Sequence, residues 1–110
     1  MICNADCTIL IRTVNPISHQ YEWNKKIYTN VYFECFKSSN IDGDKKDGCY
    51  CCIYNQTSIE AKMEDIIVKG IIEDNNINIT DIKNRYQTFS ISKITICDTG
   101  NIKHIEIESI

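Results

Sequence analysis

The feature that most constrains the fold is an alternation of side chains with a period of two residues over residues 27–35. The residues of one parity are Ile27, Thr29, Val31, Phe33 and Cys35, and those of the other are Tyr28, Asn30, Tyr32 and Glu34. Because successive side chains of a β-strand point to opposite faces of its sheet, this pattern predicts a strand with one drier face. Other segments of the sequence predict further strands that can pair with it.

Three further apolar segments predict strands. Residues 7–13 form a short one, whereas residues 49–54 and 65–72 are apolar on both faces. A strand that is apolar on both faces is buried on both sides or lies in an interface. Gly70, inside the last of these segments, predicts a bulge or a bend.

The last third of the chain predicts a broken strand and a closing one. The apolar residues change parity along this segment, from Phe89 and Ile91 to Ile94 and Ile96. The change falls at residues 92–93 and predicts a bulge or sharp bend there. After a turn at residues 99–101, Ile105 and Ile107 form a short closing strand.

Between these runs, Thr80 is the expected N-cap of one or two helical turns. Ile82 and Tyr86 are four residues apart, so both face the sheet. The sequence therefore predicts a mainly all-β fold of five or six strands with one short helix near residues 80–86. Such a pattern is typical of a small β-barrel or a compact sandwich.

Length and composition indicate one globular domain covering residues 1–110, with 43% hydrophobic and 25% charged residues. The net charge of -3 and the scattered cations do not give a nucleic-acid-binding surface. We expect no transmembrane helix, because no long uncharged apolar run occurs. We also expect no signal peptide, because the N-terminus lacks a basic start and an apolar stretch.

The seven cysteines are Cys3, Cys7, Cys35, Cys49, Cys51, Cys52 and Cys97. An odd number without an export signal argues against a disulfide framework. The spacings C-x-x-x-C and C-x-C-C fit no zinc pattern, and His19 and His104 are distant from both in sequence. We expect the cysteines to be small apolar fillers in a reducing cytosol, with no metal site and no cofactor.

Residues 37–48 are strongly polar and predict the largest loop. An EF-hand would need acids where this chain has Lys46 and Ile53, so the calcium motif fails. The loop is either a passive solvated surface or a segment that contacts a channel or a neighbouring subunit. The residues expected to make such a contact are Lys37, Asp42, Asp44, Lys45, Lys46 and Asp47.

Catalytic motifs are missing from the sequence. It contains no G-x-S-x-G, no glycine-rich phosphate loop and no H-E-x-x-H. His19 is expected to be exposed, and His104 lies on the strand face opposite Ile105 without an obvious nucleophile partner. We therefore predict a protein that is not an enzyme.

An ordered series of short motifs gives a family resemblance in the C-terminal half. The motifs are D-I-I-V-K-G (65–70), Glu73, T-D-I-K (80–83), Tyr86, F-S-I-S-K-I (89–94) and G-N-I-K-H (100–104). The series resembles the minor capsid or head–tail connector proteins of tailed phages and prophages of Gram-positive bacteria. Residues 7–13 and 21–28 resemble the family more loosely. Ile105 stands where the family has tryptophan, so contacts of that ring are not carried over.

The resemblance implies a structural virion protein of the neck, of the head-completion or stopper type, made in the cytoplasm of the host bacterium. It implies a ring-shaped homo-oligomer, expected to be sixfold, between portal or adaptor proteins and tail-completion proteins. Non-specific contact with packaged DNA is expected, and contact with a membrane is not. Three alternatives remain open: a minor capsid or decoration protein, a small host-directed binding module, and a metal-bound domain, for which stoichiometric zinc in the purified protein is the test.

Four tyrosines are predicted to lie in a subunit interface. They are Tyr28, Tyr32, Tyr50 and Tyr54, all on the second face of predicted strands. Aromatic side chains are common anchors of protein interfaces. The alternative is that these rings form a second core layer.

Overall fold

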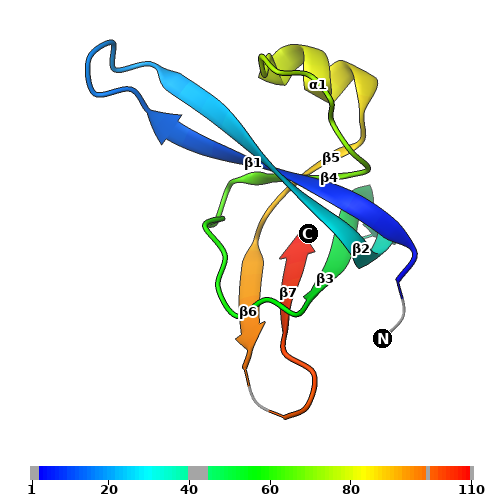
Figure 1. Ribbon diagram of the computed structural model, residues 1–110. Helices are drawn as coiled ribbons and strands as arrows, with labels where there is room; N and C mark the ends of the chain where they lie inside the picture. The colour runs from blue at the N-terminus through cyan, green and yellow to red at the C-terminus, as the bar shows by residue number, and fades with distance from the viewer. Residues whose placement is uncertain (1–2, 40–44, 99, 110) are drawn as a thin grey trace.

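The computed structural model describes residues 3–39, 45–98 and 100–109, which form seven strands and one helix (Figure 1). The elements are β1 (Ala5–Val14), β2 (Tyr21–Ser39), β3 (Lys45–Tyr54), β4 (Ile66–Lys69), α1 (Ile79–Arg85), β5 (Thr88–Ser90), β6 (Lys93–Cys97) and β7 (His104–Ser109). The strands make one antiparallel sheet in the order β5-β4-β1-β2-β3-β7-β6. The predicted fold class is confirmed, with seven strands in place of five or six.

The long strand β2 belongs to both halves of this sheet. Its first part, residues 21–31, pairs with β1, and its second part, residues 32–39, pairs with β3. Close to the junction of the two parts, Asn30 has a positive φ of 55° and donates its N–H to the Asp6 carboxylate at 3.0 Å. Within the described residues no pairing joins the edge strands β5 and β6. The sheet is therefore bent but open, and the predicted alternative of a barrel does not form.

The bend also corrects the predicted alternation over residues 27–35. Val31 and Phe33 are buried in the core as expected, but Ile27 is 41% exposed. Tyr28, predicted to face the other way, packs against the core instead. The left-handed backbone at Asn30 reverses the alternation. Before it the even-numbered Tyr28 faces the core, and after it the odd-numbered Val31 and Phe33 do.

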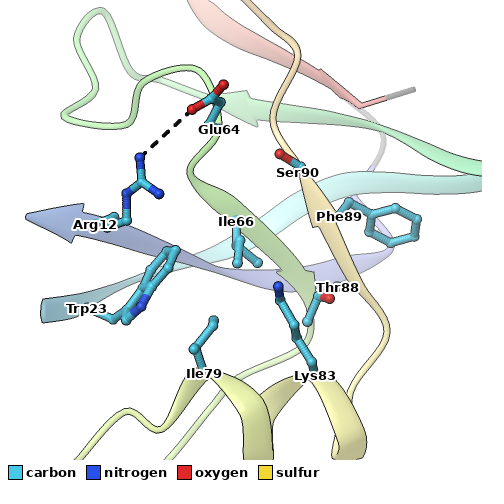
Figure 2. A pocket seen from close by; sticks show the side chains of 9 residues that line it. All are labelled: Arg12, Trp23, Glu64, Ile66, Ile79, Lys83, Thr88, Phe89 and Ser90. Atoms are coloured by element: carbon cyan, nitrogen blue, oxygen red, sulfur yellow. Dashed lines mark ion pairs between the residues drawn. The ribbon is translucent and has the colours of Figure 1, made fainter. Parts of the chain in front are cut away.

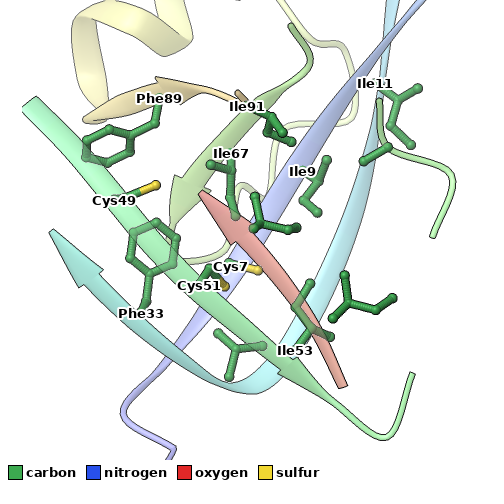
Figure 3. Packing of buried hydrophobic residues seen from close by; sticks show 14 residues of the cluster. Cys7, Ile9, Ile11, Phe33, Cys49, Cys51, Ile53, Ile67, Phe89 and Ile91 are labelled. Carbon is green, nitrogen blue, oxygen red and sulfur yellow. The ribbon is translucent and has the colours of Figure 1, made fainter. Parts of the chain in front are cut away.

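The main core lies inside the bend of the sheet, where side chains from both halves meet (Figure 3). The rings of Phe33 in β2 and Phe89 in β5 connect the halves, with centroids 6.2 Å apart. The buried members of this cluster are Cys7, Ile9, Ile11, Val31, Phe33, Cys49, Cys51, Ile53, Ala61, Ile67, Phe89, Ile91, Ile105 and Ile107.

A second apolar layer lies on the outer face of β1 and β4, beneath α1. Its buried members are Leu10, Ile66, Val68, Ile72 and Ile82. The segment 65–72 is thus apolar on both faces because Ile67 faces the main core, whereas its two neighbours face the helix layer. Burial on both sides, predicted from the sequence, is confirmed for this strand.

The helix begins two residues before the predicted position. Asn78, not Thr80, is the N-cap, and its Oδ1 accepts the N–H of Asp81 at 3.1 Å. Ile82 is fully buried against the sheet, and Tyr86 packs at the margin of the same cluster, as predicted. Arg85 forms ion pairs with Asp81 and with Asp74, which connect the helix to the segment before it.

Both predicted breaks in the chain direction are confirmed. Gly70 follows β4 with a φ of 109°, a backbone conformation that favours glycine, and its N–H donates to the carbonyl of Asp6 at 2.7 Å. At the second break, Ser92 donates its N–H to the carbonyl of Glu108 at 2.9 Å. The chain there leaves β5 and enters β6 at the opposite edge of the sheet. In the predicted turn at 99–101, Thr99 lies outside the described residues.

We predict that Ile82→Ala lowers the free energy of unfolding by about 2–5 kcal/mol, because it removes the fully buried side chain through which α1 contacts the sheet. Urea denaturation followed by circular dichroism measures this loss. The matched control is Asn84→Ala on the exposed side of the helix, expected to change stability by less than about 0.5 kcal/mol. A loss below about 1 kcal/mol for Ile82→Ala would show that the helix contributes little to the fold.

Candidate functional site

The sheet has an outer face, on β2, β3, β7 and β6, that carries three of the four predicted interface tyrosines. Strand register places Tyr32 opposite Cys52, Cys52 opposite Glu106, and Tyr54 opposite His104. We call this surface the tyrosine face. Its members are Tyr32, Tyr50, Cys52, Tyr54, Cys97, His104 and Glu106.

The rings of the tyrosine face are held by one another and by carboxylates. Tyr32 and Tyr50 make an edge-to-face contact with centroids 6.2 Å apart. The Tyr50 hydroxyl donates to Glu106 Oε1 at 2.8 Å, and burial together with this hydrogen bond raises the pKa of Tyr50 well above its ordinary value. The Tyr32 hydroxyl donates to Glu34 at 3.1 Å. These half-buried rings are therefore fixed in orientation.

The structure does not bring all four predicted tyrosines together. Tyr28 lies before the bend at Asn30 and packs against the main core. Burial raises its pKa above the ordinary value for tyrosine. The second-layer alternative therefore fits Tyr28, whereas Tyr32, Tyr50 and Tyr54 lie on the outer face.

The prediction of a loop over residues 37–48 is wrong for both ends of that segment, which are strand. β2 continues to Ser39 and β3 begins at Lys45, with Lys37 paired to Asp47 in a β-hairpin. Lys37, Lys45, Lys46 and Asp47 are thus strand residues, whose backbone pairing replaces the loop. Asp42 and Asp44 lie outside the described residues. Contact of this segment with a channel or a neighbour stays a prediction.

A pocket of about 450 Å³ lies between α1, the β1–β2 hairpin and the strands β4 and β5 (Figure 2). Trp23, Ile66 and Ile79 give it apolar walls, and charged side chains stand around them. The full lining is Arg12, Trp23, Glu64, Ile66, Ile79, Lys83, Thr88, Phe89 and Ser90. Sequence patterns did not predict this pocket, because its walls come from five segments that are distant in the chain.

Arg12, a charged group of the pocket, is held by contacts of its side chain and of its backbone. Its guanidinium lies 3.8 Å from the Glu64 carboxylate and 4.5 Å from the centroid of the Tyr21 ring. Its backbone N–H donates to Asp65, which is 1% exposed and also accepts the N–H and the ammonium of Lys62. These bonds tie the turn at 62–65 to β1 at the point where the hairpin leaves the body.

The β1–β2 hairpin extends away from the body of the protein (Figure 1). At its tip, Asn15 Oδ1 accepts the N–H groups of Ile17 and Ser18, and His19 donates its N–H to the Asn15 carbonyl. The tip also exposes large apolar side chains, with Ile17 at 89% and Tyr21 at 63% exposure. His19 is exposed, as predicted.

Three side chains of metal-binding type meet on the tyrosine face. Cys97 and His104 are directly opposite in the β6–β7 pair, and Glu106 follows on the same face. Spacing in the sequence gave no sign of this cluster, because strand pairing brings its members together. Alternation along 104–109, with a cysteine before the turn, is the signal that could have found it.

In the main core the cysteines are small buried fillers, as predicted. None of the seven is part of a disulfide, and Cys7, Cys49 and Cys51 are fully buried. Burial raises the pKa of Cys49 to about 12. A hydrogen bond with Cys7, together with burial, raises the pKa of Cys51 well above its ordinary value. Such thiols are poor nucleophiles and poor metal ligands.

We predict that brief treatment of the native protein with iodoacetamide modifies the exposed Cys3 and Cys35 and spares Cys49 and Cys51. A rise in pKa from 9.0 to about 12 lowers the thiolate fraction of Cys49 roughly a thousandfold, in addition to the loss of access. Mass spectrometry of the digested protein measures each site. All seven cysteines should react in urea, and native labelling of Cys49 at the rate of Cys3 would contradict the described core.

Two comparisons with known proteins gave no match, since neither a curated protein nor a solved structure is significantly similar to this chain. Among the described residues there is also no helix with the length and apolar content needed to cross a membrane. A family model does match, over residues 2–109 of the 110-residue chain. The chain therefore belongs to DUF6751, a family of unknown function.

Proposed function

We propose that the chain is a structural component of the neck of a tailed-phage virion, of the head-completion or stopper type, and that copies associate head-to-tail in a closed ring. The motif series between residues 65 and 104 supports the virion assignment by resemblance. The observation that carries the assembly is the projecting β1–β2 hairpin, whose tip exposes apolar side chains.

The hairpin has the properties of an arm that contacts a neighbour. Its tip is fixed by the side chain of Asn15, and its base is tied to the body through Asp65. A rigid arm loses little conformational entropy on binding, so more of its contact energy is realised as affinity. Exposed Val14, Ile17 and Tyr21 supply the apolar area.

The pocket beside α1 is the complementary surface in this proposal. The hairpin tip of one copy enters the pocket of the next copy and covers the apolar walls formed by Trp23, Ile66 and Ile79. The two surfaces are different parts of the chain, so the contact is heterologous. A heterologous contact repeated around an axis generates a ring when the rotation closes.

The location of the protein in particles tests the assignment. A short epitope inserted between Gln56 and Thr57, in an exposed turn away from hairpin and pocket, is decorated with a gold-labelled antibody fragment and imaged by electron microscopy. The proposal expects gold at the single vertex where head meets tail. Gold spread over the shell would establish a decoration protein instead. Particles without gold would favour the host-directed module.

We predict that Ile17→Asp lowers incorporation into particles about 10–100-fold, because it removes the burial of one large apolar side chain, worth about 1.5–3 kcal/mol. The side chain is 89% exposed, so the melting temperature should not change. Quantitative immunoblotting of purified particles measures incorporation, and circular dichroism measures the melting temperature.

The control is Thr57→Asp, at an exposed position outside the hairpin, which should be incorporated normally. Tyr32→Asp distinguishes the two candidate surfaces, because it changes the tyrosine face and leaves the hairpin intact. If Tyr32→Asp blocks incorporation and Ile17→Asp does not, the contact between copies lies on the tyrosine face and the hairpin proposal is wrong.

A further inference from the structure

The cluster at the β6–β7 hairpin brings together a thiol, an imidazole and a carboxylate. One ligand atom from each of Cys97, His104 and Glu106 lies within 4.8 Å of the other two. All three residues are half-buried, with the His104 and Glu106 side chains 24% and 34% exposed. Two antiparallel strands fix their positions, since Cys97 and His104 are register partners and Glu106 follows on the same face.

The hydrogen bonds of His104 determine which ring nitrogen is available. Nδ1 lies 3.2 Å from the carbonyl oxygen of Ile102, which can only accept, so Nδ1 carries the proton. In the neutral ring Nε2 then has a free lone pair, and Nε2 is the atom that faces Glu106 Oε1 at 3.5 Å. Both atoms carry lone pairs, so a metal ion placed between them can be bound by both.

The side chains of His104 and Glu106 are also held by contacts with further residues, as metal ligands usually are. The backbone carbonyl of Ile102 fixes the tautomer and the plane of the His104 ring. The Tyr50 hydroxyl donates to Glu106 Oε1 at 2.8 Å, and the Tyr54 ring packs on His104 with centroids 6.5 Å apart. These partners restrict the rotamers of both ligands before any ion binds.

We propose that this cluster is a binding site for a divalent transition-metal ion of the zinc type. The ligands are Cys97 Sγ, His104 Nε2 and one carboxylate oxygen of Glu106, and water completes the tetrahedron. A mixed sulfur, nitrogen and oxygen set suits Zn²⁺ and Co²⁺ rather than Mg²⁺ or Ca²⁺, which prefer oxygen ligands alone. Cys97 binds as the thiolate and releases its proton to solvent.

The geometry of the cluster is close to that of an occupied site. Bonds of about 2.0–2.3 Å from zinc to its ligands place neighbouring ligand atoms of a tetrahedron about 3.3–3.7 Å apart. The 3.5 Å between His104 Nε2 and Glu106 Oε1 already meets this requirement. The largest separation within the cluster is below 4.8 Å, so closure around an ion needs a shift of about 1 Å by side chains that are not fully packed.

This site departs from the sequence-based expectation of no metal. That expectation rested on the lack of cysteine pairs at the short spacing by which zinc knuckles are recognised in a sequence. Here the ligands are spaced C-x₆-H-x-E, and the pattern has meaning only once β6 and β7 are paired. The proposal does not depend on the neck assignment, because it rests on the described side chains alone.

Cobalt titration of the purified full-length protein, after treatment with a chelator, tests the site. We expect one Co²⁺ per chain, the visible bands of tetrahedral cobalt and a thiolate-to-cobalt charge-transfer band in the near ultraviolet. Zn²⁺ should displace the cobalt. Cys97→Ser should abolish the charge-transfer band, and His104→Gln and Glu106→Gln should each raise the Kd at least about tenfold.

Matched variants separate this cluster from the other thiols and imidazole of the chain. Cys35→Ser and His19→Gln, both at exposed positions, should leave the cobalt spectrum unchanged. Tyr50→Phe removes only the hydrogen bond to Glu106 and should raise the Kd about tenfold. A spectrum without tetrahedral cobalt bands, or one that survives Cys97→Ser, would overturn the proposal.

A second measurement uses the unmodified chain and so does not depend on the folding of variants. Zn²⁺ should protect Cys97 from iodoacetamide and leave the labelling of Cys35 unchanged, because only the first thiol becomes a metal ligand. Equal labelling of Cys97 with and without Zn²⁺ would mean that His104 and Glu106 form an ordinary ion pair, and the site would be rejected.

Discussion

The fold depends on the bend of one strand. β2 runs for 19 residues and pairs with β1 up to Val31 and with β3 from Tyr32 onward. The positive φ of Asn30 is held by a hydrogen bond from its N–H to the Asp6 carboxylate on the neighbouring strand. Because the strand turns there, the two halves of the sheet face each other and enclose the main core, in which Phe33 and Phe89 meet.

The layers of the protein follow from that bend. β1 and β4 lie between two apolar clusters, with Ile9 and Ile67 facing the main core and Leu10 and Val68 facing the layer beneath α1. The other half of the sheet has a core on one side only, so its outer face is polar and aromatic. The pocket arises at the border of the helix layer, and the Cys97 cluster arises on the outer face. The pocket therefore lies in the half of the sheet that α1 covers, and the Cys97 cluster lies in the half whose outer face has no such cover among the described residues.

The sequence predicted the features that depend on local patterns. Ile82 and Tyr86 are four residues apart and both pack against the sheet. The break at Gly70 falls where a glycine ends the apolar strand, and the break at Ser92 falls where the parity of the apolar residues changes. The features that depend on distant pairing could not be predicted in this way. The alternation around Asn30 shows no irregularity in the sequence, because the reversal is imposed by the carboxylate of Asp6 on another strand. The meeting of Cys97 with His104 likewise requires the register of β6 and β7.

The continuity of β2 has a mechanical consequence. The strand runs without interruption from the hairpin at Tyr21 to its pairing with β3 at Ser39. A pull on the hairpin is therefore transmitted to the far half of the sheet along covalent bonds, and the ladder between β2 and β3 is loaded in shear, with its hydrogen bonds sharing the force. Asn30 is the only left-handed residue along the described length of this strand. The bend at this residue therefore lies on the covalent path between the hairpin and the far half of the sheet, and its hydrogen bond to Asp6 lies on that path too.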